Sequence, residues 1–220
     1  MAVMWHGGNR WSGTPEIRPA KGGRAEWGPG LYGSTSYFRA ASYAKGGKVT
    51  HLIEYNPRLL LGDAAIGLDL ARDFVRDNAP RSKQADILEF LAEESVQHRI
   101  SDKFTVVGNG KPFLAGSLLN LWVNSGLASG VRGPALSEFF SQHGIDAYSD
   151  SVSGLNGERE TWTVIFNPDA ITENHIITAS DVPDALWTLP DPRDNPDETV
   201  SGLYSEVAPA QKRRTGMRMG

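Results

Sequence analysis

Apolar and polar positions alternate in some stretches of the chain and recur at helical spacing in others. Strand patterns occur at residues 2–5 (AVMW), in LYGST from Leu31, and at residues 49–55 (VTHLIEY), where β-branched and aromatic residues are frequent. The alanine-rich YFRAASYA, between the last two, predicts a helix that Gly46 and Gly47 end.

In the middle of the chain, apolar residues recur at the spacing of helices. They predict helices at residues 66–77 and 83–99, and two more at about 112–124 and 134–142. IDAYS and TWTVIFNP then predict two further strands, separated by the loop SVSGLNGE. This order favours an α+β fold, because strict strand–helix alternation is missing.

The composition divides the chain into two parts. We expect one domain over residues 1–180, with a helical insertion at about 64–130. From Asp181 the chain is rich in Pro and Asp, and it ends in the basic QKRRTGMRMG. Residues 181–220 are therefore expected to be an extended tail, ordered only if a partner holds it. Alternatively, the basic end is a solvated terminus that binds no partner.

Composition and charge exclude several classes of function. The chain has 220 residues, a formal net charge of −4 and no cysteine, so disulfides, thiol nucleophiles and cysteine-ligated metals are excluded. The histidines show no metal-binding spacing, and we expect no metal. A nucleic-acid partner is unlikely on charge grounds. FLAGSLLNLWV is too short to span a bilayer, and no secretory signal is visible. We expect a soluble, cytoplasmic protein.

Gly28 to Gly33 fit G-x-G-x-x-G, the fingerprint of a dinucleotide-binding turn, and Glu54 lies where such folds place a ribose-binding acid. That motif has meaning only after a buried strand. The preceding PAKGGRAEW is polar and glycine-rich, so we interpret the match as accidental.

A second set of residues forms a pattern across the first 55 positions. His6 and Gly7 follow the first predicted strand, and GPGLYGSTSYFRAASYA carries Tyr32 and Tyr43 eleven residues apart. This pattern resembles the ADP-ribosyltransferase family, specifically its poly(ADP-ribose)-polymerase-like (H-Y-E) branch. In that branch H-G is followed by G-x-G-[IL]-Y and by a helix with a second tyrosine.

The family's late glutamate has two candidates here, Glu158 and Glu160, before TWTVIFNP. On a strand both would share one face with Trp162 and the apolar residues beyond it. We favour Glu160, while Glu158-Arg159-Glu160 is also similar to the E-x-E of arginine-modifying transferases. HGIDAYSDS is similar to a segment often found before this glutamate. The resemblance covers about residues 3–55 and 134–171.

The resemblance implies an ADP-ribosyltransferase-like split mixed β-core with flanking helices and a helical insertion, with NAD+ as substrate and no metal. Tyr32 and Tyr43 would enclose the cationic nicotinamide ring, which suits stacking and cation–π attraction. The Gly7 backbone would bind the nicotinamide amide, and His6 the adenosine ribose. Glu160 would stabilise the oxocarbenium-like transition state. Gly30 and Ser34 complete the predicted NAD+-binding set, and His6, Tyr32, Glu158 and Glu160 the catalytic one.

These residues imply a mono-ADP-ribosyltransferase that modifies a protein acceptor, as a bacterial or phage effector such as a toxin or anti-CRISPR. A phage-encoded protein would act in the host cytoplasm on a host protein. One departure is Ala40, where the family often has a serine that holds the nicotinamide amide. Two alternatives therefore stay open: an NAD+ glycohydrolase with the same site, and a catalytically inactive binding or virion-associated module. Taken singly, the tyrosines also fit packing roles, His6 a turn, and both glutamates a solvated hairpin.

Overall fold

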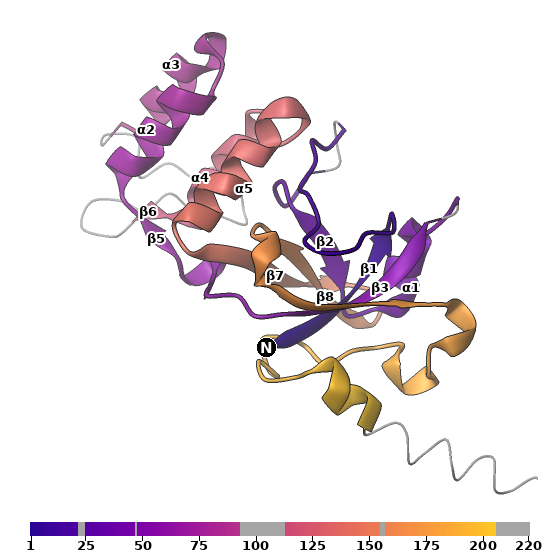
Figure 1. The fold of residues 1–220 in the computed structure, drawn as a ribbon. Helices are drawn as coiled ribbons and strands as arrows, with labels where there is room; N and C mark the ends of the chain where they lie inside the picture. The colour runs from indigo at the N-terminus through magenta and orange to yellow at the C-terminus, as the bar shows by residue number, and fades with distance from the viewer. Residues whose placement is uncertain (22–24, 47, 93–112, 155–156, 206–220) are drawn as a thin grey trace, which may run out of the picture.

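A seven-stranded sheet is the framework of the protein (Figure 1). The structure is a computed structural model that describes residues 1–21, 25–46, 48–92, 113–154 and 157–205. The strand order is β4-β7-β8-β2-β1-β3-β9, and each neighbouring pair is antiparallel except β4 with β7. The strands span β1 Ala2–Gly8, β2 Leu31–Ser34, β3 Val49–Tyr55, β4 Leu59–Leu60, β7 Ile145–Ser153, β8 Arg159–Ile165 and β9 Ile171–Ile177.

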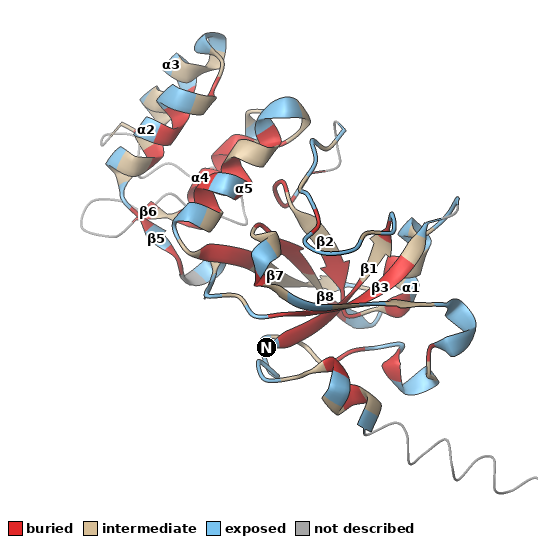
Figure 2. Cartoon of the chain, viewed as in Figure 1, coloured by how far each residue is buried: buried red, intermediate tan, exposed pale blue. Residues whose placement is uncertain are grey.

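Helices gather at the β4–β7 end of the sheet (Figure 1). A two-stranded ladder, β5 (Ala65–Ile66) with β6 (Phe113–Leu114), joins this helical layer to the sheet. The helices are α2 (Leu68–Asn78), α3 (Arg81–Phe90), α4 (Ala115–Asn124) and α5 (Gly133–Gln142). Of these, α4 is the most deeply buried, since eight of its ten residues are buried (Figure 2). The short helix α1 (Tyr37–Tyr43) lies apart from them, beside β1.

Two apolar clusters cover one face of the sheet. Met4 and Ile165 belong to a small cluster on the opposite face, so their strand neighbours Trp5 and Val164 point away from it. Val164 packs against the helical layer. Trp5 packs against α1 and residues 182–203. The helical layer and α1 therefore cover different halves of the same sheet face.

The structure differs from the expected extended tail over residues 181–205. Five apolar side chains of this segment are buried against β1, β3 and α1, namely Val182, Leu186, Leu189, Val200 and Leu203. The Trp5 indole Nε1 donates to the Leu186 carbonyl at 2.9 Å, and buried Glu54 accepts from the Val200 amide at 3.0 Å. Residues 206–220, which include the basic end, lie outside the described residues.

The α+β prediction is confirmed: the sheet is mostly antiparallel and helices flank it. The strand at residues 49–55 has the predicted bounds, and α1 forms where YFRAASYA predicted it. β9 was not predicted, and the helix expected at 83–99 is described only as far as Phe90 in α3. None of the described helices is long and apolar enough to cross a membrane.

Candidate functional site

A pocket of about 560 Å³ opens beside the centre of the sheet, where β1 and β2 stop pairing. On its β3 side, β1 is paired along its whole length, but on its β2 side the only register pair is Trp5 with Ser34. The walls come from β1, the turn before β2, β2, α1, the loop after α1, and β8. The lining residues are Trp5, His6, Gly7, Glu26, Trp27, Tyr32, Gly33, Ser34, Arg39, Ala40, Ser42, Tyr43, Lys45, Lys48 and Trp162.

His6 bridges the gap between the two diverging strands. Its Nδ1 lies 2.6 Å from the Tyr32 carbonyl oxygen, and because a carbonyl can only accept, Nδ1 carries the proton. Burial lowers the pKa of His6 to about 4, although the hydrogen bond to Tyr32 opposes this shift; nearby His51 and Lys48 lower it further. The ring is therefore neutral at pH 7, and its Nε2 is an acceptor suited to a ligand hydroxyl.

Gly7 lies at the closest approach of α1 to β1. A Cβ at this position would lie 1.8 Å from the Ala40 carbonyl oxygen, so only glycine permits this packing. Gly7 and Ala40 both line the pocket, as does Ser42. The helix thus forms a wall of the pocket because residue 7 has no side chain.

The two tyrosines line the same pocket but differ in exposure. The Tyr32 hydroxyl donates to the Gly28 carbonyl at 2.6 Å and accepts from the Trp27 amide at 3.1 Å. Burial raises the pKa of Tyr32, so the phenol stays protonated. Its hydroxyl is thus held by the preceding turn. Tyr43, at the end of α1, is 59% exposed and bounds the pocket from the solvent side.

Glu160 lies behind the pocket wall and does not line the pocket. Its side chain is only 5% exposed, and one oxygen, Oε1, accepts from Arg39 Nε and from Trp162 Nε1, each at 2.7 Å. Both donors belong to pocket-lining residues. The guanidinium of Arg39 also lies over the Trp162 ring, 5.1 Å from its centroid. A buried carboxylate, a guanidinium and an indole thus form one unit at the pocket wall.

The other predicted site residues lie in three different settings. Glu158 is exposed and precedes β8, so it is not part of this unit. Gly30 does not line the pocket, and a Cβ there would lie 2.4 Å from Val164 Cγ1. Ser34 does line the pocket, but it is buried and its Oγ accepts from the Ser36 amide at 3.0 Å.

The interpretation of Gly28–Gly33 as an accidental fingerprint agrees with the structure. The described residues before Gly28, at 19–21 and 25–27, form no strand, and Gly28 adopts a positive φ of 93°. Glu54 does not line the pocket, and its carboxylate accepts hydrogen bonds from the Thr172 hydroxyl and the Val200 amide.

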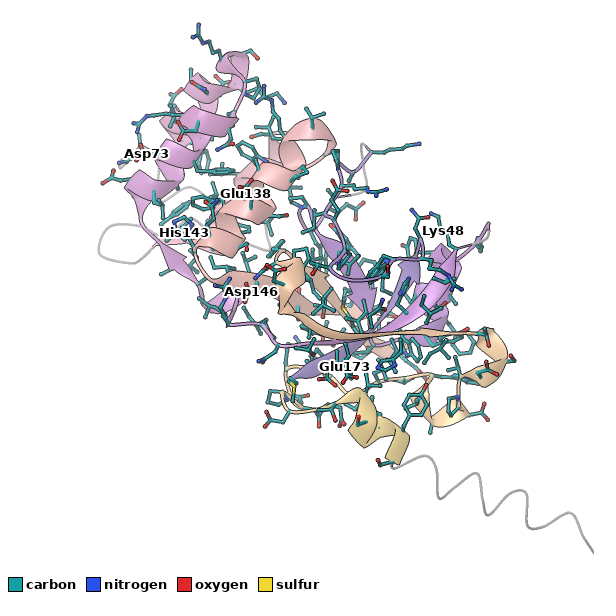
Figure 3. All side chains as sticks on the ribbon, in the orientation of Figure 1. Lys48, Asp73, Glu138, His143, Asp146 and Glu173 are labelled. Carbon is teal, nitrogen blue, oxygen red and sulfur yellow. The ribbon has the colours of Figure 1, made fainter. Side chains whose placement is uncertain are left out.

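Sequence reasoning did not assign roles to the pocket's cations. Arg39, Lys45 and Lys48 line it together with a single acidic residue, Glu26. The spacing of Arg39 and Tyr43, four residues apart on a helix, was the available signal, since such residues share one face. Lys48 lies at the sheet end of the molecule, away from the acidic residues labelled on α2 and α5 (Figure 3). The pocket is therefore suited to a ligand that combines aromatic and anionic parts.

Those acidic residues surround a smaller hollow of about 360 Å³ between α2 and α5, lined by Asp73, Asp77 and Glu138 beside Phe74 and Phe139. Asp73 is paired with Arg76 within α2. Among the residues that the structure describes, no group of three or more histidine, aspartate or glutamate side chains is arranged to hold a metal ion.

Comparison with known proteins found no match to this chain among family models, curated proteins or solved structures.

Proposed function

We propose that the protein binds NAD+ in the pocket between β1 and β2 and transfers its ADP-ribose to a protein acceptor, as a mono-ADP-ribosyltransferase. One observation carries the proposal. His6, Gly7, Tyr32 and Tyr43, which the sequence singles out, come from three separate elements and line one pocket. Its volume of about 560 Å³ lies within the usual range of ligand sites.

The pocket residues match the parts of NAD+ in chemical type. The aromatic rings of Tyr32 and Tyr43 offer π faces to a cationic nicotinamide ring. Neutral His6 offers an acceptor at Nε2 to a ribose hydroxyl. In the reaction, the C–N bond between nicotinamide and ribose breaks, and its electron pair leaves with nicotinamide. The acceptor's nucleophile then bonds to ribose C1′ and loses its proton.

Glu160 is the proposed electrostatic group. Its Oε1 is occupied by Arg39 and Trp162, whereas no hydrogen bond from the described residues reaches Oε2. In the proposed reaction the carboxylate acts from behind the pocket wall, where its negative charge stabilises the positive charge that develops on the sugar. Loss of such a group costs on the order of 10²-fold in rate.

A catalytically inactive NAD+-binding module is the second candidate, favoured by the same residue. Glu160 is buried behind Arg39 and Trp162, and Ala40 stands where the family often has a hydroxyl. In this candidate, Glu160 has the structural role of holding Arg39, and NAD+ binds without cleavage.

The test incubates purified protein with labelled NAD+ and a bacterial lysate, and measures free nicotinamide and protein-bound label separately. Glu160→Gln is compared with Glu158→Gln, a matched change at an exposed position. Label on a discrete band that is lost only in Glu160→Gln supports the transferase. Nicotinamide without label would favour the glycohydrolase. NAD+ binding without either product would favour the inactive module.

A further inference from the structure

Arg39 is held in place more firmly than an ordinary surface arginine. Its Nε donates to buried Glu160, its guanidinium lies over Trp162, and its side chain is only 19% exposed. A guanidinium has five N–H donors in a planar fork. Glu160 uses the one on Nε, and no described residue accepts from the terminal nitrogens. Four donors are thus left for a ligand.

The surroundings of Arg39 favour an anion. It lines the pocket together with Lys45 and Lys48, whose side chains are exposed and form no ion pair with the described residues. Glu26 is the one acidic residue among the lining residues. The negative charge of Glu160 is already engaged by the Nε side of Arg39, so its terminal side is available to a second anion. A rigid guanidinium with flanking ammonium groups is typical of phosphate recognition.

We infer that Arg39, held by Glu160 and Trp162 and assisted by Lys45 and Lys48, forms a phosphate-binding subsite of the pocket. The inference rests on the proposed function for the identity of the ligand, in which the phosphate belongs to the diphosphate of NAD+. Glu160 then has a positioning role toward this subsite: its carboxylate fixes the guanidinium, and the guanidinium contacts the phosphate.

Calorimetric titration with inorganic pyrophosphate and with ADP tests the subsite without requiring NAD+ cleavage. Arg39→Gln should weaken pyrophosphate binding about tenfold or more, because it removes a charge-assisted, bidentate contact. Arg39→Lys should retain part of the affinity, since it keeps the charge but loses the fork. Glu160→Gln should also weaken binding, whereas Glu89→Gln, at an exposed position of α3, should not.

Two further variants distinguish loss of a ligand contact from loss of folding. Arg81→Gln, on exposed α3 away from the pocket, is the matched control and should leave pyrophosphate binding unchanged. The Lys45→Gln/Lys48→Gln double variant changes only exposed side chains and should weaken binding about threefold to tenfold. If Arg39→Gln does not fold, this variant and the salt dependence of the native protein decide the question, because added salt screens exposed cations.

The outcomes separate this inference from the proposed function. Pyrophosphate binding that depends on Arg39, without NAD+ cleavage, would support the subsite and leave the transferase unsupported. The subsite would be overturned if pyrophosphate did not bind, or if it bound Arg39→Gln and the double lysine variant as strongly as the native protein. If NAD+ were still cleaved in that case, the transferase proposal would stand without the subsite.

Discussion

The hydroxyl group of Tyr32 closes the turn that precedes β2. It donates to the Gly28 carbonyl and accepts from the Trp27 amide, and both backbone groups belong to buried residues. Removing one partner of a buried hydrogen bond leaves the other without compensation. The ring and the hydroxyl of Tyr32 thus have separable roles, in the pocket and in the turn.

Tyr32→Phe is expected to lower the free energy of unfolding by about 1–3 kcal/mol, because it removes both hydrogen bonds and keeps the ring. NAD+ binding by the folded variant should change little. Urea denaturation and calorimetry measure the two quantities. Unchanged stability would show that solvent replaces the hydroxyl in the turn.

Stability should also depend on pH through His6. Its pKa in the folded protein, about 4, lies below the ordinary 6.5, so between these values the unfolded chain binds the extra proton. The free energy of unfolding therefore rises with pH across this window and falls on acidification, by about 3 kcal/mol at most. His51, whose pKa burial also lowers, acts in the same direction.

The measurement is the free energy of unfolding at several pH values between 4 and 7 for three proteins. His6→Gln should show a clearly shallower fall on acidification than the native chain. Ser201→Ala, which changes an exposed side chain that does not ionise, should follow the native chain. Identical slopes for all three would assign the pH dependence to other groups.

For single residues, the sequence identified the histidine and the two tyrosines that line the pocket, but it did not predict which side chains Glu160 contacts. Alternation along β8 correctly placed Glu160 and Trp162 on one face, since it depends on neighbouring residues alone. The pairing of Glu160 with Arg39 joins residues 121 positions apart. A contact of that separation depends on the tertiary fold and leaves no local pattern.

Among the elements, the segment over residues 182–203 is the clearest departure from expectation. Its Pro and Asp content is typical of a disordered tail, yet five of its apolar residues, though widely spaced, are buried on β1, β3 and α1. The overall composition of such a segment does not reveal that a few of its apolar side chains are buried against the sheet. β9 was missed for a related reason, because ITENHII places polar residues in the middle of an edge strand.

Leu186→Ala should lower the free energy of unfolding by about 2–4 kcal/mol, because Leu186 is 2% exposed in the cluster around Trp5. Ser201→Ala, at an exposed position of the same segment, should change it by less than about 0.5 kcal/mol. Chemical denaturation of both variants provides the comparison. Equal, small effects would mean that the segment contributes little to stability.

For the whole molecule, the pocket joins parts of the fold that are distant in sequence. Its walls come from β1, β2, α1 and β8, so a ligand there contacts the sheet and α1 together. A ligand that binds only the folded state at 100 times its Kd stabilises it by about 2.7 kcal/mol. For a chain of this size, that corresponds to a rise in Tm of about 5–10 °C.

We therefore expect NAD+ to raise the Tm by that amount and Tyr43→Ala to reduce the rise. Because Tyr43 is 59% exposed, the variant should melt at the native temperature when no ligand is added. Differential scanning fluorimetry with and without NAD+ measures both effects. An equal rise in native protein and variant would exclude Tyr43 from the ligand site.

The bond from the Trp5 indole to the Leu186 carbonyl has a consequence for how the chain is made. The two residues are 181 positions apart, and Trp5 is fully buried in the finished protein. At synthesis rates of about 5–20 residues per second, roughly 10–40 s pass between the synthesis of β1 and that of the segment that covers it. During that time β1, an interior strand of the sheet, has an apolar face that residues 182–203 do not yet cover, so a chaperone that shields nascent chains should act on this protein before release.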